Sequence, residues 1–127
     1  MKYKFGLNFQ RDGNATEMGG GVTATTHTAE TVYISHPLSS YGIFCFNEEG
    51  DLFLNSDWGF YGFSWRAFGD DFKDFLSRTN ADYIVGKFAI NYREVAGKKL
   101  PQHKQNHLLN LVSAFIKSLK KSLNDNK

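Results

Sequence analysis

The first residues with a spacing suited to chemistry are two histidines placed four positions apart. His103 and His107 would share one face of an α-helix, which is the geometry in which two imidazoles bind one metal ion. A zinc protease also needs a glutamate directly after the first histidine as general base, and Lys104 stands there. We therefore expect surface histidines, with no bound metal ion and no cofactor.

A glycine run, an acidic cluster and a further histidine are the other candidates. Gly19–Gly21 can present backbone N–H groups to a phosphate, but the run lacks the lysine and hydroxyl residue of a P-loop. Asp70, Asp71 and Asp74 suit a magnesium ion, but acidic residues are also typical of a first helical turn. His27 has no nucleophile in a suitable turn beside it. These patterns predict that the protein is not an enzyme and has no catalytic residues.

Composition limits the class of protein. The 127 residues fit one domain, over 1–127, and a single cysteine excludes a disulfide framework. Cys45 lies between Phe44 and Phe46, so we expect a buried, unreactive thiol. No stretch approaches the ~20 apolar residues that cross a bilayer, and no apolar signal region follows Met1–Lys4. These features favour a cytoplasmic protein that does not bind a membrane.

The formal net charge of +2 is an average over two oppositely charged regions. Residues 1–97 carry 8 basic and 12 acidic side chains, a net charge of −4. Residues 98–127 carry 7 lysines and 1 aspartate, a net charge of +6. A basic end on an acidic body indicates an anionic partner for that end.

Alternation of apolar and polar residues predicts an antiparallel sheet of about four to six strands. Residues 2–10 are expected to form a half-buried strand, because the odd positions of that run are apolar: Tyr3, Phe5, Leu7 and Phe9. Further strands are expected at 22–28, 31–35 and 61–67. Residues 41–56 predict a hairpin.

The apolar spacing then changes to that of helices. We expect a short helix capped by Asp70 or Asp71, and a second short helix capped by Asn80. Residues 83–92 suit either a helix or a strand. From Pro101 onward the sequence predicts one long amphipathic helix packed on the sheet. Its apolar stripe comprises Leu108, Leu111, Val112, Phe115, Ile116 and Leu119. The expected fold class is α+β.

The aromatic residues are concentrated in 57–68, which contains six of them in twelve residues. A packed central strand explains this pattern, with Phe60, Arg66 and Phe68 on its outward side. A recognition surface explains it too, because Tyr, Trp and Arg are preferred anchors of protein interfaces. The nearby carboxylates would repel a phosphate backbone, so a protein partner fits better than a nucleic acid. The candidate partner-binding residues are Glu48, Glu49, Asp57, Trp58, Phe60, Arg66, Phe68, Asp70, Asp71 and Asp74.

The lysine-rich end of the long helix leaves three interpretations open. In the first, the positive charges of the lysines complement the partial negative charge at the helix C-terminus and keep the helix soluble. Lys117, Lys120 and Lys121 can also contact nucleic acid, although no arginine or interleaved aromatic residue supports them. Thirdly, the apolar stripe can pair two copies into a homodimer if the sheet does not cover it.

Residues 50–88 carry a pattern that resembles a known group of proteins. The matching residues are the run Gly50–Gly59, then Tyr61, Trp65, Phe72-Lys73-Asp74-Phe75-Leu76, Asp82-Tyr83 and Lys87. This pattern resembles small accessory proteins encoded by bacteriophages and prophages, with Phe63 where a second tyrosine is common. The resemblance covers about a third of the chain and carries over no catalytic residue.

The resemblance implies a genomic setting rather than a mechanism. Short phage accessory genes often encode non-enzymatic inhibitors of host defence, including anti-CRISPR proteins. Our first hypothesis is therefore an inhibitor that binds a host protein, such as a CRISPR effector or another nuclease, in the host cytoplasm. Its acidic body can mimic phosphates to a basic channel. The alternatives are a nucleic-acid-binding module that uses the lysine-rich helix, and a small-ligand pocket between helix and sheet.

Overall fold

The computed structural model describes residues 15–125 and has the α+β fold that the sequence predicts. All the described strands precede the helices in the chain. The strands are β1 (Ala15–Gly19), β2 (Val22–Thr25), β3 (Ala29–His36), β4 (Ser40–Asn47), β5 (Asp51–Ser56) and β6 (Gly59–Ser64). The helices are α1 (Phe72–Ser77), α2 (Ala81–Ala96) and α3 (Gln102–Asp125). The strand predicted at 2–10 lies outside the described residues.

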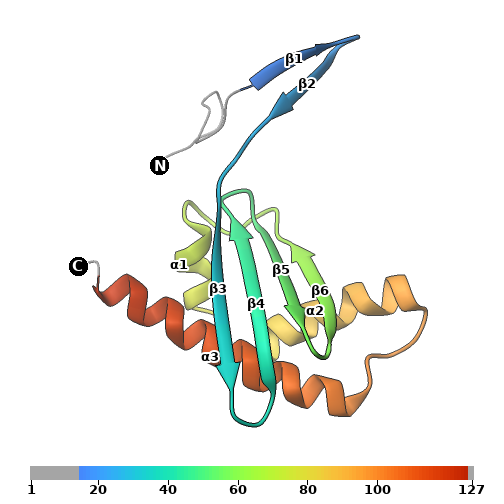
Figure 1. Cartoon of the computed structure of the whole chain (residues 1–127), viewed down its shortest axis with the longest axis vertical. Coiled ribbons are helices and arrows are strands. Elements are labelled where there is room, and N and C mark those ends of the chain that lie inside the picture. The colour runs from blue at the N-terminus through green and yellow to red at the C-terminus, as the bar shows by residue number, and fades with distance from the viewer. Residues whose placement is uncertain (1–14, 126–127) are drawn as a thin grey trace.

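The described strands form two sheets rather than the one that the sequence predicts. β3, β4, β5 and β6 make an antiparallel meander in sequence order, with β3 and β6 at its edges. β1 and β2 pair only with each other and extend beyond the start of β3, away from the rest of the molecule (Figure 1). The predicted strand at 22–28 is shorter, because β2 ends at Thr25.

The glycine run forms the turn of the β1–β2 hairpin. Gly19, Gly20 and Gly21 have φ angles of 89°, 63° and 80°. Glycine adopts such positive φ angles without the steric penalty that a Cβ atom would bring. The run that resembled a phosphate-binding loop in the sequence therefore reverses the direction of the chain.

The three helices cover one face of the four-stranded sheet. Alternate residues of β4 and β5 are buried, while the residues between them are half-buried or exposed. Figure 1 shows β3 and β4 crossing in front of α3, which packs on the sheet from behind. The sheet thus has a helix-covered face and an opposite face, which we call the open face.

The buried stripe of α3 forms the centre of the core. The Phe115 ring lies parallel to that of Phe44, with centroids 4.1 Å apart, and meets the Phe46 ring edge-on at 5.9 Å. The six residues predicted for the stripe are all buried. The long amphipathic helix is therefore confirmed. No helix within residues 15–125 is both long and apolar enough to cross a membrane.

Side-chain caps start α1 and α2 where the sequence predicts them. The backbone N–H of Asp74 donates to Asp71 Oδ1 at 3.1 Å, and that of Tyr83 donates to Asn80 Oδ1 at 2.9 Å. These caps satisfy backbone donors that have no partner inside the first helical turn. α2 runs for 16 residues, longer than the short helix expected, so residues 83–92 are helical.

β6 is shorter than the strand predicted at 61–67. It ends at Ser64, and the backbone N–H of Trp65 then donates to Gly50 O at 2.8 Å. The chain leaves the sheet here and turns toward α1, so strand alternation no longer determines which side chains face outward. Phe68 packs edge-on against Phe72 with centroids 4.9 Å apart and is half-buried, so its predicted outward position is wrong.

Replacing Phe115 with alanine should remove the ring stack at the centre of the core. We expect the free energy of unfolding to fall by about 3–5 kcal/mol, as is typical of a buried Phe→Ala change. Val95→Ala, at a side chain of α2 that is 81% exposed, is the control and should change it by less than about 0.5 kcal/mol. Urea denaturation measures both, and equal losses would contradict the core assignment.

Candidate interaction surface

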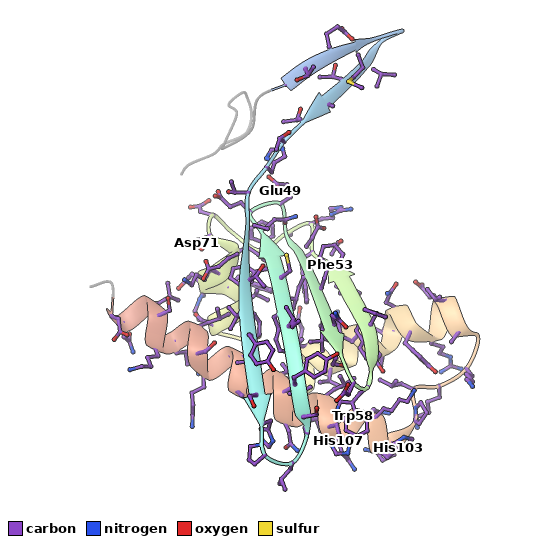
Figure 2. All side chains as sticks on the ribbon, viewed as in Figure 1. Glu49, Phe53, Trp58, Asp71, His103 and His107 are labelled. Carbon is purple, nitrogen blue, oxygen red and sulfur yellow. The ribbon has the colours of Figure 1, made fainter. Side chains whose placement is uncertain are left out.

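The open face of the sheet carries a band of apolar and aromatic side chains. Cross-strand register sets Tyr33, Ile43, Asn55 and Phe60 in one row, and Thr31, Cys45, Phe53 and Gly62 in the next. Tyr33, Phe53 and Phe60 are 64%, 53% and 80% exposed. Figure 2 shows Phe53 on the side of the sheet away from the helices. Exposed apolar side chains that are grouped on one face mark an interaction site more often than scattered ones do.

Two tyrosines extend the band toward the edge of the four-stranded sheet that β3 forms. The rings of Tyr33 and Tyr41 are parallel within 5°, with centroids 6.3 Å apart. Cys45 lies on the same face and is only half-buried, because along β4 it alternates with the buried Phe44 and Phe46. The expectation of a buried thiol is therefore wrong. Stacked aromatic rings provide a large contact area and lose little conformational freedom on binding.

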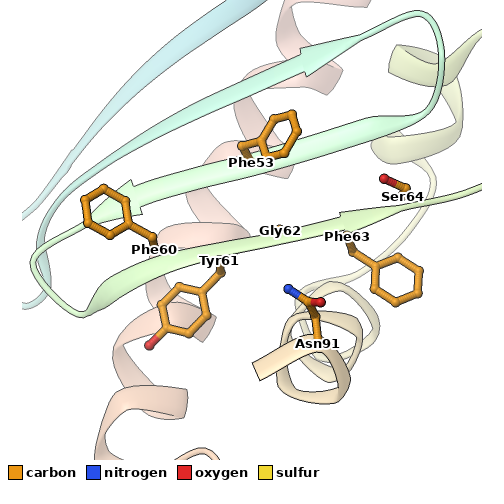
Figure 3. A pocket seen from close by; sticks show the side chains of 7 residues that line it. All are labelled: Phe53, Phe60, Tyr61, Gly62, Phe63, Ser64 and Asn91. Carbon is orange, nitrogen blue, oxygen red and sulfur yellow. The ribbon is translucent and has the colours of Figure 1, made fainter. Parts of the chain in front are cut away.

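A shallow groove of about 500 Å³ follows β6 at the other edge of the open face (Figure 3). It is lined by Phe53, Phe60, Tyr61, Gly62, Phe63, Ser64 and Asn91. Gly62 allows the Phe53 ring to approach β6, because a Cβ atom at position 62 would lie 3.2 Å from that ring. Asn91 of α2 brings a side-chain amide to the opposite wall. The groove thus continues the apolar band and adds polar groups at its border.

The predicted partner-binding residues are divided between opposite ends of the four-stranded sheet. Five of them form what we call the acidic end, at the β4–β5 turn and the start of α1: Glu48, Glu49, Asp70, Asp71 and Asp74 (Figure 2). Cations balance part of this charge. The Arg78 guanidinium lies 3.0 Å from Asp74 Oδ2, and Lys73 Nζ lies 3.1 Å from Oε2 of Glu30, a further carboxylate at the start of β3. The acidic end borders the open face where β5 begins.

Trp58 and Asp57 lie at the opposite end, in the β5–β6 turn (Figure 2). The Trp58 indole stacks on the His107 imidazole, with centroids 3.7 Å apart and planes within 3°. Its N–H donates to Ser39 O at 2.8 Å, and the Ser40 hydroxyl donates to the Asp57 carboxylate. Trp58 is therefore half-buried and packs against α3, with one ring face covered by His107.

Ser39 fastens α3 to the β3–β4 turn. It is fully buried, Asn110 Nδ2 donates to its Oγ at 2.9 Å, and that Oγ lies 2.9 Å from His107 Nδ1. The Ser39 hydroxyl thus accepts from the Asn110 amide and shares a second hydrogen bond with the His107 imidazole, whose direction depends on which ring nitrogen carries the proton. No substrate can reach a serine without exposed surface, so this pair has a structural role.

The metal and nucleic-acid candidates lie on α3, away from the open face. His103 is exposed one helical turn before His107 (Figure 2). Within residues 15–125, no three His, Cys, Asp or Glu side chains are arranged to hold a metal ion. Lys117, Lys120 and Lys121 are exposed on the side of α3 that turns away from the sheet. The lysines and the open aromatic face therefore belong to different surfaces.

Asp51 stands between the acidic end and the open face, at the start of β5. Burial by itself raises the pKa of this carboxyl. Hydrogen bonds from Ser64 Oγ at 2.6 Å and Asn47 Nδ2 at 3.0 Å, together with the positive charge of Arg66, outweigh burial and hold the pKa of Asp51 below its usual value. Ionised Asp51 thus joins the ends of β5 and β6 and stabilises the β4–β5 turn.

Sequence reasoning found Phe60 but missed the rest of the band, including Tyr33, Tyr41 and Phe53. A signal was present in Ile43–Phe46, where four consecutive residues are apolar. A strand that is covered on one face alone alternates between apolar and polar residues, whereas an unbroken apolar run is typical of a strand covered on both faces. This run therefore indicates that the second face of β4 also meets an apolar surface.

Comparison with known proteins gives one family. A model described as a phage family matches residues 22–122, from β2 nearly to the end of α3. No curated protein and no solved structure matches the chain. The matched region includes the described residues of the open face, the acidic end and the Ser39 cluster.

Replacing Ser39 with alanine should destabilise the fold through lost hydrogen bonds. Asn110 and His107 would keep their half-buried polar atoms without a partner, which typically reduces the free energy of unfolding by about 1–3 kcal/mol. Ser113→Ala, at an exposed position of the same helix, is the matched control and should have a small effect. Thermal or urea denaturation compares the two, and equal stability of both variants would refute the structural role of Ser39.

Asp51 should contribute to acid sensitivity. Its pKa is lower in the folded than in the unfolded protein, so its stabilisation is complete above the unfolded pKa, near pH 4, and is lost as pH falls through the folded pKa. In Asp51→Asn, the free energy of unfolding should depend less steeply on pH below about pH 5. Asp70→Asn removes the same charge from an exposed position and is the control for net charge. Parallel acid dependences in Asp51→Asn and the wild type would contradict this assignment.

Proposed function

The chain belongs to a phage protein family, and from this premise we propose that it is a non-enzymatic interaction protein that binds a protein partner through its open face. The observation that carries the proposal is the uncovered aromatic band on the four-stranded sheet. Tyr33, Phe53 and Phe60 each expose more than half of their surface on that face. Covering such residues with a partner removes apolar area from water at roughly 25 cal/mol per Å².

Charge favours a protein partner over a nucleic acid. Aromatic side chains on a sheet can stack single-stranded bases, but such sites also need cations that follow the phosphates. The open face instead borders Asp51 and the acidic end, where carboxylates would repel phosphates. Lys117, Lys120 and Lys121 cannot serve the same site, because they project from the far side of α3.

The partner should combine an apolar patch with lysines or arginines at its border. The apolar part would cover the aromatic band, and the cations would meet the acidic end. Host enzymes with a nucleic-acid channel lined by Lys and Arg have this charge. We therefore propose inhibition of such an enzyme, a CRISPR effector or another host nuclease, in the host cytoplasm, as the biological outcome of binding.

Binding to purified host nucleases, CRISPR effectors included, tests the proposal. We expect the double change Phe53→Ser and Phe60→Ser to weaken binding at least about tenfold, which corresponds to about 1.4 kcal/mol. Both side chains are exposed, so the fold should be retained. The matched control is Ile90→Ser with Val95→Ser, which removes two exposed apolar side chains from α2. Titration calorimetry measures affinity, and nuclease assays measure inhibition.

Two outcomes would overturn the proposal. One is equal binding by the wild type and the Phe53/Phe60 variant, because the open face would then not be the contact. The other is salt-sensitive binding to single-stranded DNA that is lost on changing Lys117, Lys120 and Lys121 to glutamine, with no protein bound. That result would instead support a nucleic-acid module on α3, since phosphate contacts are the ones that salt weakens.

A further inference from the structure

β6 is an edge strand with outward backbone groups that lack a partner within residues 15–125. The backbone N–H of Trp65 donates to Gly50 O, which continues the register of β5 and β6 by one pair. Along an antiparallel strand, residues that bond to the neighbouring strand alternate with residues whose N–H and C=O groups point away. Counting back from Trp65, the backbone groups that point away from β5 are those of Phe60, Gly62 and Ser64. None of them forms a hydrogen bond with another described residue.

The composition of β6 leaves this edge accessible to another strand. Edge strands are usually protected by proline, by lysine or by a bulge. The segment Gly59–Ser64 contains neither proline nor lysine, and its ladder with β5 has no bulge. Gly62 lies at the middle of the strand and has no side chain to keep another backbone at a distance. The groove of about 500 Å³ follows the same strand, so there is room beside it.

Two polar side chains of α2 also lie at this groove and have unused binding capacity. Asn91 is half-buried and points toward β6 (Figure 3), and its amide forms no hydrogen bond with another described residue. Lys87 lies one helical turn earlier. Its ammonium is 5.5 Å from the centroid of the Phe63 ring, which lines the groove, and it forms no ion pair with a carboxylate of residues 15–125. A ligand with amide and carboxylate groups would satisfy both side chains.

The chemistry of the edge matches an extended peptide. Its outward N–H and C=O groups recur every second residue, a repeat of about 6.8 Å. An extended peptide backbone offers C=O and N–H groups at the same repeat, so every outward group gains a partner. We propose that an extended segment of the protein partner docks in this groove as a strand added to β6. The inference rests on the proposed function, because the segment belongs to that partner.

The two sides of the groove define which side chains the segment needs. Residues opposite each other in a ladder point to the same face of the sheet. The residue opposite Gly62 therefore lies on the open face, where an apolar side chain would contact the exposed Phe53 ring. Its neighbours point toward α2, where a glutamate or aspartate would meet Lys87 and a polar side chain would meet Asn91. The segment thus alternates apolar with polar residues and includes a carboxylate.

Amide hydrogen exchange of the full chain with a synthetic peptide tests the added strand. The probe is an N-acetylated, C-amidated peptide of eight residues that alternates valine with threonine and has glutamate in place of one central threonine. In the free protein, the amides of Tyr61 and Phe63 should exchange slowly because they bond to β5, whereas those of Phe60, Gly62 and Ser64 should exchange fast. With the peptide at about ten times its dissociation constant, the three fast amides should exchange about tenfold slower.

Two altered peptides separate backbone contacts from side-chain contacts. N-methylation of the peptide amides that face β6 removes the backbone donors and should abolish the protection. Glutamine in place of the glutamate should weaken binding about two- to fivefold, as is typical of a partly exposed ion pair. In Lys87→Gln, the two peptides should bind equally, because the cation that distinguishes them is gone.

Gly62→Pro extends the test to a host nuclease that the protein binds. Proline at this position removes an outward N–H donor but no hydrogen bond to β5. Gly62→Ala adds a Cβ atom at the same place and keeps the donor, so it is the matched control. We expect Gly62→Pro to bind the nuclease at least about tenfold more weakly than Gly62→Ala does. Slow exchange of the Tyr61 and Phe63 amides in both variants shows that β6 remains paired with β5.

Three outcomes would overturn the added strand. The first is slow exchange of the Phe60, Gly62 and Ser64 amides in the free protein, because the edge would then already be paired. The second is unchanged exchange of these amides at millimolar peptide, or equal protection by the N-methylated peptide. The third is equal nuclease binding by Gly62→Pro and Gly62→Ala.

The proposed function and the added strand can fail separately. When Phe53→Ser with Phe60→Ser weakens nuclease binding but Gly62→Pro binds as well as Gly62→Ala, the open face is the contact and the added strand is refuted. When the peptide protects the outward amides but the Phe53 and Phe60 changes leave nuclease binding intact, the strand site stands and the proposed function is refuted.

Discussion

The packing of α3 against a single face of the four-stranded sheet is the constraint on which the rest of the structure depends. Phe115 stacks on Phe44, and the whole apolar stripe of the helix is buried in that layer. Each described helix follows the strands in the chain and packs on this same face. The period of two along each strand then places Tyr33 and Phe53 on the uncovered side. The open face is thus a direct consequence of where the helices pack.

Local patterns in the sequence predicted most of the described elements. Asp71 and Asn80 were expected as helix caps, and the spacing of apolar residues predicted α3, because both signals depend only on neighbours along the chain. The errors occur where contacts between residues far apart in the sequence determine which side chains are buried. Phe68 leaves the strand pattern to pack on α1, and Cys45 is only half-buried because the helices pack on the other face of β4. Alternation shows that a strand has two faces, but not which one a helix will cover.

The candidate surface was only partly predictable for the same reason. Residue type alone suggested Trp58 as a recognition anchor, but its position beside His107 places it in a packing contact. Glu49 and Asp71, separated in the sequence, lie at one end because the β4–β5 turn meets the chain that enters α1 (Figure 2). Tyr33 joins this surface only through cross-strand pairing, which no linear pattern reveals.

The open face and the edge strand β3 are two features of one sheet, and both lie within the region that the family model matches. The matched region begins at residue 22, so it contains the described band on the open face but excludes β1. A strand added at β3 would enlarge the band beside Tyr33 without altering the rows on β4, β5 and β6. A partner could therefore bind the rows on β4, β5 and β6 whether or not a strand is added at β3. Because a backbone edge binds any extended segment of suitable alternation, a strand that occupies the edge of β3 would also keep other strands from pairing there.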